Sequence, residues 1–295
     1  MIKSILGIIR APFLILVPAC VAVGIGTAYW QVKELNWTYI LLILIGAVSA
    51  HISVNVFNEY FDFRSGLDAK TRRTPFSGGS GTLQARPEFL RITLLVAWLS
   101  FIITSLVGLF FVWVRGWQLL PIGIAGLIIV IAYTPFLTRN PLACLLAPGL
   151  GFGVFVVMGT HFALTGTYTW TSFVASLVPT FLVSNLLLLN QFPDIEADRR
   201  VGRSHFPILI GTKASSALFG SFLVLTYASV ILGIVLGLLP IFCALALLTA
   251  FWAKRAYRDS RKKAQIDSFS IRSMSINVVI NLVTPVLLAI GLFIG

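Results

Sequence analysis

The chain has 295 residues, of which 58% are hydrophobic and only 11% are charged, and its mean hydropathy is +0.95. Soluble globular proteins usually carry about 25% charged residues, so this composition excludes an ordinary soluble domain and indicates an integral membrane protein. The net charge of +12 does not imply nucleic-acid binding, because the sequence has no known nucleic-acid-binding module and no basic–aromatic stripe.

Apolar segments long enough to cross a membrane recur along the whole chain. A spanning helix needs about 20 apolar residues, and we predict nine such helices in an all-α membrane bundle, with eight or ten as the alternatives. The first residues lack the small-residue cleavage site of a signal peptide, so we expect them to belong to the mature protein. The expected spans are residues 11–31, 37–60, 89–114, 118–136, 141–165, 170–192, 214–237, 239–256 and 271–294.

The basic residues predict the orientation of this bundle. With the N-terminus in the cytoplasm, 20 of the 22 lysines and arginines fall on the cytoplasmic side, and only Lys33 and Arg115 fall outside. Cytoplasmic loops of membrane proteins carry this excess of positive charge. We therefore expect a multi-pass protein of the cell membrane with its N-terminus and acidic loops inside and its C-terminus outside. Attraction to anionic lipid headgroups explains the net charge.

The three cysteines give no sign of a disulfide or a zinc site. Cys20, Cys144 and Cys243 lie far apart inside apolar runs, without CxxC or Cys/His spacing. Such cysteines are usually small buried hydrophobic residues.

Most of the acids fall into two clusters on the predicted cytoplasmic side. The first cluster, "NEYFDFRSGLD", ends the second span and contains Glu59, Asp62 and Asp68. The second, "NQFPDIEADRRVGR", ends the sixth span and contains Asp194, Glu196 and Asp198. Acids are unfavourable at the C-terminal end of a helix, and like charges on one helical face repel each other. The clusters therefore call for a bound partner of positive charge.

The two clusters are related by a constant offset. Asn58 and Asp62 are four residues apart, as are Asp194 and Asp198, and the offset between the pairs is 136 residues. Residues four apart share one helical face. We interpret the chain as one domain, 1–295, built from a four-helix unit used twice in parallel, with a ninth helix added. The first repeat would span about 11–136, the second about 141–256, and the extra helix 271–294.

Carboxylate and amide oxygens in this arrangement suit Mg²⁺, which completes its coordination shell with water and phosphate oxygens. Several basic residues near the two clusters could grip the remaining charge of a diphosphate. These candidate diphosphate-binding residues are Lys70, Arg72, Arg73, Arg199 and Arg203.

The two clusters resemble the motifs of the UbiA-type membrane prenyltransferases, commonly written NDxxDxxxD and DxxxD, which lie in corresponding cytoplasmic loops of a nine-helix fold. The first cluster is most similar to the 1,4-dihydroxy-2-naphthoate polyprenyltransferase branch, and Asn58, Asp62, Gly66 and Asp68 match its pattern. The second motif reads "DIEAD", and the later "DIEADRRVGRSHFPILIG" also resembles that branch. The resemblance covers almost the whole chain in topology.

Three features depart from the family pattern. Glu59 stands where aspartate is usual. Gln191 and Pro193 replace an amide and an arginine in the segment before the second motif. The segment Arg72–Leu83 is rich in glycine and serine, unlike the usual segment with its own basic residues. The metal site is unaffected by these changes, but the identity of the acceptor stays open.

The resemblance implies Mg²⁺-dependent transfer of an isoprenoid chain from a polyprenyl diphosphate to an electron-rich acceptor. An allylic cation would form in a pocket that excludes water. Asn58, Asp62, Asp194 and Asp198 would be the catalytic residues that hold the metal ions. Glu59 and Asp68 would be further ligands or would orient the nearby basic residues.

Other polar residues could serve the acceptor or support the metal ligands. His51 lies two turns before Asn58 on the same helical face, and a structural role is favoured over a role in the acceptor site. Asn190 precedes Asp194 by four residues, and His205 follows the second motif. The glycine- and serine-rich stretch Ser77–Gly81 could cover a diphosphate with backbone N–H groups, or could be a simple loop.

The predicted acceptor is 1,4-dihydroxy-2-naphthoate, in the biosynthesis of menaquinone-type quinones, with 4-hydroxybenzoate or homogentisate-like rings as alternatives. Transfer to a phosphate-bearing lipid or sugar also stays open. A secondary transporter is a remote alternative, because transporter charges belong near the middle of the helices and these acids sit at cytoplasmic ends. The expected partners are a polyprenyl diphosphate, an aromatic acceptor and the lipid bilayer, without nucleic acid.

Overall fold

The computed structural model describes residues 2–68, 71, 73–261 and 269–295, and these residues form helices and loops without any strand. The α-helices are α1 (Ile2–Ile8), α2 (Leu16–Val32), α3 (Trp37–Ser65), α4 (Thr82–Ala85), α5 (Leu90–Arg115), α6 (Leu120–Ala132), α7 (Pro141–Leu150), α8 (Gly159–Thr165), α9 (Trp170–Asn190), α10 (Ile195–Arg200), α11 (Phe206–Val235), α12 (Ala250–Ser260) and α13 (Phe269–Ile294). The remaining helical segments are η1 (Ala11–Ile15), η2 (Pro87–Phe89), η3 (Trp117–Leu119), η4 (Leu137–Arg139), η5 (Gly151–Met158) and η6 (Ile241–Thr249).

Seven helical segments among the described residues are long and apolar enough to cross a membrane. They are Ala11–Val32, Trp37–Ser65, Pro87–Arg115, Pro141–Thr165, Trp170–Asn190, Phe206–Val235 and Ile271–Ile294. The fourth predicted span corresponds to the shorter apolar helix Trp117–Ala132. The eighth corresponds to η6 followed by α12, so it is not one uniform α-helix. The protein is thus a multi-pass membrane protein, and the count of nine spans stays a prediction.

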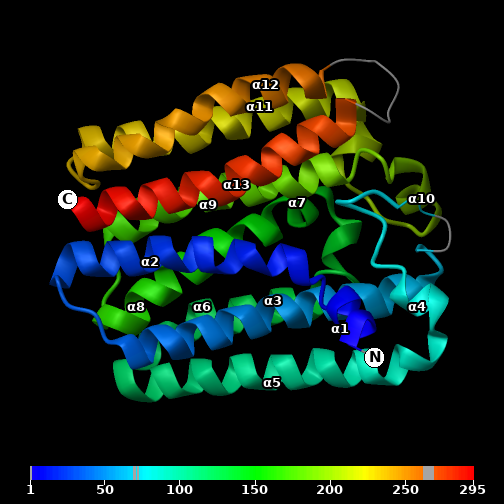
Figure 1. Ribbon diagram of the computed structural model, residues 1–295, viewed down its shortest axis with the longest axis horizontal. Helices are drawn as coiled ribbons and strands as arrows, with labels where there is room; N and C mark the ends of the chain where they lie inside the picture. The colour runs from blue at the N-terminus through cyan, green and yellow to red at the C-terminus, as the bar shows by residue number, and fades with distance from the viewer. Residues whose placement is uncertain (1, 69–70, 72, 262–268) are drawn as a thin grey trace.

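The long helices run roughly parallel to the long axis of the molecule and form a bundle (Figure 1). Helix α3 packs against α5, α9 packs against α11, and α13 packs against α2. The short helices α4 and α10 lie at one end of the bundle, and the C-terminus lies at the opposite end (Figure 1). Arg203 pairs with Asp62 of the first acidic cluster and Asp198 of the second, so both clusters lie at the same end.

Helix α5 shows how the bundle meets lipid. Large apolar side chains recur on it at spacings of three and four residues, which places them on one helical face. Backbone groups of a helix are satisfied within the helix, so such a face can be left to hydrocarbon. The exposed residues of this face are Leu95, Leu99, Ile102, Leu106, Leu109 and Trp113.

Local signals at both ends define the helix that carries the first acidic cluster. The side chain of Asn36 caps α3 by accepting a hydrogen bond from the backbone N–H of Tyr39 at 3.0 Å. Gly66, with a left-handed φ of 71°, ends the helix, as glycine commonly does. Asn58 and Asp62 consequently lie one turn apart near the end of α3, on one face.

The second acidic cluster differs from the prediction in its local structure. Helix α9 ends at Asn190, a turn follows, and Asp194 precedes the separate short helix α10, which contains Asp198. The cluster does not continue the sixth span, because Pro193 cannot extend the hydrogen-bonding pattern of α9. Helix α11 as a whole begins at Phe206, but Gly211 inside it is non-helical (φ 75°, ψ 169°), so a kink separates a short first part from the long helix that follows. The predicted start of the seventh span at residue 214 lies close to this kink, and Lys213 lies just after it within α11.

Small residues let the fifth predicted span lie close to α9. A Cβ at Gly149 would meet the side chain of Ser184, and a Cβ at Gly153 would meet that of Thr180. Within this span η5 is a π-helix, a widened form often found at functional sites. Helix η5 also contributes residues to the cavity described next.

Candidate active site

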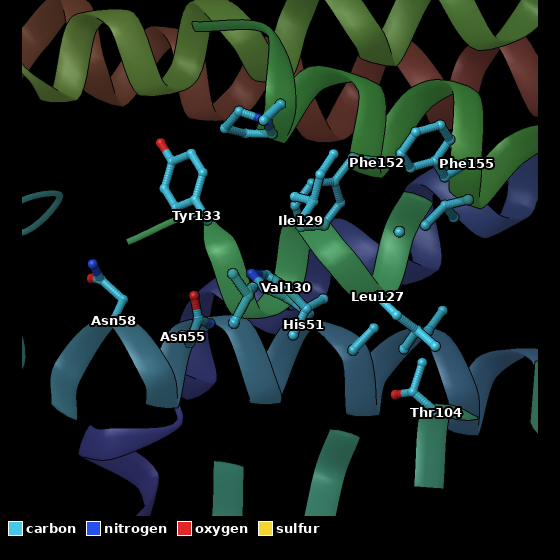
Figure 2. A pocket seen from close by; sticks show the side chains of 18 of the residues that line it. His51, Asn55, Asn58, Thr104, Leu127, Ile129, Val130, Tyr133, Phe152 and Phe155 are labelled. Atoms are coloured by element: carbon cyan, nitrogen blue, oxygen red, sulfur yellow. The ribbon is translucent and has the colours of Figure 1, made fainter. Parts of the chain in front are cut away.

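A cavity of about 580 Å³ opens at the end of the bundle where the two acidic clusters meet. Asn58 and Tyr133 lie at one end of this cavity, and Thr104 and Leu127 lie at the other (Figure 2). The lining changes from polar at the first end to apolar farther in, with contributions from α3, α5, α6 and η5. This shape suits a molecule with a charged head and a long apolar tail.

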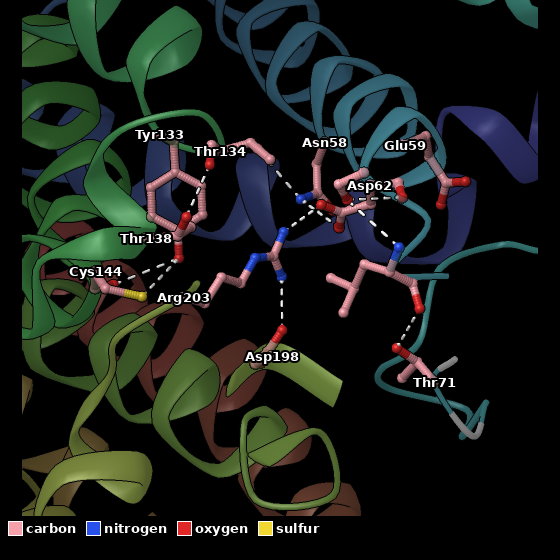
Figure 3. A network of polar contacts seen from close by, with 12 residues as sticks. Asn58, Glu59, Asp62, Thr71, Tyr133, Thr134, Thr138, Cys144, Asp198 and Arg203 are labelled. Atoms are coloured by element: carbon pink, nitrogen blue, oxygen red, sulfur yellow. Dashed lines mark hydrogen bonds and ion pairs between the residues drawn. The ribbon is translucent and has the colours of Figure 1, made fainter. Parts of the chain in front are cut away.

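Arg203 joins the two acidic clusters at the polar end, which we call the mouth. One guanidinium nitrogen donates to Asp198 Oδ1 at 3.1 Å and another donates to Asp62 Oδ1 (Figure 3). Asp62 is 5% exposed and Asp198 is 4% exposed. Burial alone would lower the pKa of Arg203, but the adjacent Asp62 and Asp198 outweigh it and raise that pKa. Arg203 is thus a permanent positive charge between two acids that lie 136 residues apart.

His205 supports Asp198 from the other side. Its Nε2 lies 3.0 Å from Asp198 Oδ2, and the histidine is almost fully buried. Its Nδ1 has no hydrogen-bond partner among the described residues, although His205 lines the cavity. Each carboxylate oxygen of Asp198 therefore has one fixed contact, Oδ1 with Arg203 and Oδ2 with His205, which restricts the orientation of the group.

Asp194 and Asn190 face the same cavity with oxygens that lack a partner. Asp194 Oδ1 and Asn190 Oδ1 are buried and have no hydrogen-bond partner among the described residues. Burial raises the pKa of Asp194 to about 7, and the nearby carboxylate of Asp198 adds to the rise. A buried acceptor without a donor is unfavourable, so this pair of oxygens points to a bound group.

Asn58 is held by three neighbours. Its Oδ1 accepts from Arg10 at 2.8 Å, and its Nδ2 donates to Asp62 Oδ2 at 3.0 Å and to Thr134 Oγ1 at 3.2 Å (Figure 3). The adjacent Glu59 is completely buried and is not among the residues that line the cavity. The structure therefore places Asn58 in the site and Glu59 behind it.

Asp68, the last acid of the first cluster, lines the cavity mouth and is 4% exposed. Burial raises its pKa, and the charge of Glu59 raises it further. Gly78 and Gly79 of the stretch Ser77–Gly81 line the same mouth. Both glycines have left-handed φ angles, of 86° and 70°, which this compact loop requires.

The predicted diphosphate-binding cations are only partly brought together. Arg203 lines the cavity, but Arg199 is exposed and pairs with Glu196 at 3.1 Å, and Arg73 is exposed beside Gln84. Neither Arg73 nor Arg199 is among the residues that line the cavity. Lys70 and Arg72 lie outside the described residues.

His51 points into the cavity from α3, between its polar and apolar ends (Figure 2). Its ring meets that of Phe152 edge to face, with the centroids 4.8 Å apart. Nδ1 of His51 has no hydrogen-bond partner among the described residues. The predicted cavity-facing orientation of this histidine is present in the structure.

Three contributors to the mouth were not predicted. Arg10, from the segment before η1, contacts both Asn58 and Glu59. Tyr133 follows α6, lines the cavity, and donates from its hydroxyl to the carbonyl of Cys144 at 3.4 Å. Gln191 donates to Cys144 Sγ at 3.2 Å. Arg10 could be counted only as a cytoplasmic charge, since no local motif connects it with α3.

The donor atoms at the mouth fit a divalent cation that is held jointly with phosphate. Within the described part of the chain, no three side chains of Asp, Glu, His or Cys form a ready cluster for a metal ion. Arg203 lies between Asp62 and Asp198 instead (Figure 3). Asp194 Oδ1 and Asn190 Oδ1 are nevertheless buried oxygens that could coordinate a metal ion, and neither has a hydrogen-bond partner among the described residues. Mg²⁺ typically takes few protein ligands and fills its shell with water and phosphate oxygens.

Comparison with known proteins found similar sequences and similar folds. The sequence profile of the UbiA prenyltransferase family matches residues 15–279. A 1,4-dihydroxy-2-naphthoate octaprenyltransferase of Bacillus subtilis (strain 168) is 30% identical over 221 residues, which cover 72% of this chain and 67% of that protein. A digeranylgeranylglyceryl phosphate synthase of Methanobrevibacter smithii is 26% identical over 190 residues, and the match covers 64% of each chain.

The fold has a close counterpart among solved structures. A UbiA homolog from Archaeoglobus fulgidus, bound to GPP and Mg²⁺, matches with a TM-score of 0.71 at 11% identity. The match covers 99% of this chain and 100% of that chain. The whole described bundle therefore has the same fold.

Proposed function

The chain belongs to the UbiA prenyltransferase family, and from this premise we propose that it transfers a polyprenyl group from its diphosphate to an aromatic acceptor of the 1,4-dihydroxy-2-naphthoate type. The observation that carries the proposal is the meeting of Asp62 and Asp198 at Arg203, at the mouth of a cavity with an apolar interior. The charged mouth suits the diphosphate head of the substrate, and the apolar interior suits its isoprenoid tail.

We assign the cation site to Asp62, Asp194 and Asp198, with Mg²⁺ as the ion. The A. fulgidus relative that contains Mg²⁺ supports the choice of metal. Mg²⁺ bound there would neutralise the charge that develops on the departing diphosphate. Asn58 was predicted as a further ligand, but its oxygen already accepts from Arg10 and its nitrogen donates to Asp62. This geometry favours a role in orienting Asp62.

Arg203 provides the second charge at the mouth. Its guanidinium can exchange one carboxylate partner for a phosphate oxygen, since an arginine presents five N–H donors. The bond between C1 of the prenyl chain and the diphosphate oxygen then breaks, and the diphosphate leaves with the bonding electrons. A ring carbon of the acceptor forms the new bond to C1, and the ring loses a proton or its carboxyl group to regain aromaticity.

The interior of the cavity protects this reaction from water. Apolar and aromatic side chains of α6 and η5, including Phe152 and Phe155, line the part beyond Asn58 (Figure 2). Water would capture an allylic cation, and a dry pocket suppresses that side reaction. Aromatic faces also stabilise a nearby cation.

The assignment of the acceptor follows the B. subtilis relative, which is 30% identical and is named as a 1,4-dihydroxy-2-naphthoate octaprenyltransferase. A phosphate-bearing glycerol lipid is the second candidate, because the M. smithii relative is named for a glyceryl phosphate product. 4-Hydroxybenzoate, homogentisate-like rings and a phosphate-bearing sugar complete the acceptors to be tested. A secondary transporter is disfavoured, because the charged residues gather at one end of the bundle rather than in its middle.

We further propose nine membrane crossings, in which Trp117–Ala132 and the η6–α12 segment complete the seven long spans. Two parallel four-helix repeats and one added helix would then account for the chain. The cation site would face the cytoplasm, because the basic residues concentrate on that side.

Transfer of a radiolabelled prenyl group tests the function. Purified protein in lipid vesicles is given polyprenyl diphosphate, one acceptor at a time, and either Mg²⁺ or a chelator. We expect Mg²⁺-dependent product with 1,4-dihydroxy-2-naphthoate and much less with the other acceptors. Preferential labelling of the glycerol phosphate lipid would replace the naphthoate assignment, and no labelled product with any acceptor would refute the enzymatic proposal.

A further inference from the structure

Glu59 is a buried carboxylate whose partners all lie outside its own helix. Its Oε1 accepts from Arg10 Nε at 2.9 Å and from the backbone N–H of Ser80 at 2.7 Å. Its Oε2 accepts from the hydroxyl of Ser80 at 3.0 Å. The side chain is 0% exposed, and a charge buried this deeply is stable only when it is paired and hydrogen-bonded.

Arg10 connects the carboxylate of Glu59 with Asn58 at the mouth. While Nε donates to Glu59, another guanidinium nitrogen donates to Asn58 Oδ1 at 2.8 Å. The backbone of Arg10 is left-handed, with φ 53° and ψ 50°, which is uncommon for a residue other than glycine. The contacts to α3 hold this conformation, and they determine which side of the Asn58 amide faces Asp62.

Ser80 connects the same carboxylate with the loop over the mouth. The stretch Ser77–Gly81 contains three glycines with left-handed φ, and Gly78 and Gly79 line the cavity. A Cβ on Gly79 would lie 2.7 Å from both carboxylate oxygens of Asp68, so the loop lies directly on that acid. Glycine-rich backbone is costly to order, and the two hydrogen bonds from Ser80 to Glu59 supply a fixed point within it.

We infer that Glu59 is a positioning residue that fastens the Ser77–Gly81 loop over the diphosphate mouth and, through Arg10, holds Asn58 in the orientation that supports Asp62. We call the three residues Arg10, Glu59 and Ser80 the latch. Glu59 does not line the cavity, so it acts through its neighbours and not on the reacting atoms. The longer arm of glutamate allows the carboxylate to reach both Arg10 and Ser80, which gives a physical reason for glutamate where aspartate is usual.

The structural part of this inference is tested by hydrogen–deuterium exchange of the full-length protein in lipid nanodiscs, without substrate. The readout is exchange in peptides that contain the Ser80 amide. We expect Glu59→Gln to speed that exchange at least about tenfold, because the acceptor of the Ser80 N–H loses its charge. Ser80→Ala should speed it less, since the backbone bond is kept. Glu196→Gln, which alters an exposed acid paired with Arg199, should leave the loop unchanged.

The kinetic part rests on the proposed function. For Glu59→Gln we expect the KM for the prenyl diphosphate to rise about 10- to 100-fold, as for other residues that orient a metal ligand, while the KM for the acceptor stays constant. Glu59→Asp should restore part of the loss, because it keeps the charge on a shorter arm. Glu196→Gln should match the wild-type kinetics.

Each outcome decides the inference. Unchanged loop exchange in Glu59→Gln overturns the latch, as does an equal rise in the two KM values. If the whole Glu59→Gln protein is unfolded, the milder Ser80→Ala variant provides the test. Exchange of the loop at the wild-type rate in Ser80→Ala would also overturn the latch. If no acceptor is prenylated, the proposed function fails, but the exchange experiment still tests the latch because it needs no substrate.

Discussion

At the scale of single residues, Asp62 and Asp198 are the acids on which the proposed chemistry depends most. Each belongs to a different cluster, and both are buried against Arg203. We expect Asp62→Ala and Asp198→Ala to lower transfer at least about 100-fold, because electrostatic stabilisation of a leaving group is commonly worth that much. The measurement is the rate of prenyl transfer by each variant, made on protein that is extracted as a monodisperse peak.

Glu196→Ala is the matched control for these two variants. Glu196 lies on the same short helix as Asp198, but its side chain is 73% exposed and, within the described part of the chain, pairs only with the exposed Arg199. Its loss should change transfer by less than about twofold, since exposed ion pairs contribute little. Equal losses in all three variants would contradict the assignment.

The raised pKa of Asp194 leads to a prediction of how Mg²⁺ binding depends on pH. Burial and the charge of Asp198 raise its pKa to about 7, so this acid is mostly protonated below that pH and ionised above it. Mg²⁺ needs the ionised form, and its apparent affinity should therefore fall about tenfold for each pH unit below about 7. Titration of transfer activity with Mg²⁺ at several pH values measures this.

The Asp194→Asn variant separates the titration of Asp194 from other effects of low pH on the protein. It should need far more Mg²⁺ at every pH and should lose the steep dependence below neutrality, because the titrating group is gone. Glu196→Gln should keep the wild-type profile. A wild-type Mg²⁺ requirement that stays constant from about pH 6 to 8 would be incompatible with Asp194 as a ligand.

Sequence reasoning at this scale found the acids but not their neighbours. Asp62, Asp194 and Asp198 could be found because their spacing recurs along the chain. Arg10 could not, because it lies 48 residues before Asn58, which it contacts, and carries no local motif. Arg73 and Arg199 satisfy the same sequence criterion as Arg203, yet only Arg203 lines the cavity. Proximity along the chain does not determine which cation faces inward.

At the scale of helices, α6 determines how much room the isoprenoid tail has. Gly126 lines the cavity two turns before Tyr133, which is about 10 Å along the helix. A Cβ there would meet only Phe155, at an ordinary contact distance of 3.7 Å. The position can therefore accept a side chain, and that side chain would extend into the apolar part of the cavity.

We expect Gly126→Leu to reduce transfer from long polyprenyl diphosphates while keeping transfer from geranyl diphosphate. Gly126→Ala adds only one carbon and should change the preference much less. Competition between a long and a short donor in one reaction measures the ratio directly. A parallel loss with both donors would show that the tail does not pass this face of α6.

The elements themselves were predictable to different degrees. Helix α3 has a clear apolar run with Asn36 and Gly66 at its ends, and its predicted start at residue 37 is confirmed. The eighth predicted span was less predictable, because η6 and α12 divide it and α12 carries a basic, amphipathic sequence. The second acidic cluster was placed at the end of α9, whereas Pro193 and the following turn separate it as α10.

At the scale of the whole molecule, the orientation in the membrane can be measured with single cysteines. The native Cys20, Cys144 and Cys243 are all buried, so the wild-type protein should stay unlabelled by a membrane-impermeant maleimide. We expect Glu34→Cys, in the loop between α2 and α3 on the proposed outer side, to react in intact cells and Arg258→Cys to react only after permeabilisation, because basic loops face the cytoplasm. Both positions are exposed. The opposite pattern would invert the proposed topology.

The bridge made by Arg203 and the latch made by Glu59 also bear on how such a chain could have arisen. The 136-residue offset that relates the two acidic clusters places Leu67 opposite Arg203, and Ile195 opposite Glu59. Each device is therefore present in one half alone. If the halves descend from a duplicated unit, an ancestor with two equal halves would have carried each device either twice or not at all. Divergence after duplication would then have left the anchored loop in one half and the bridging cation in the other, so that the two halves could no longer replace each other.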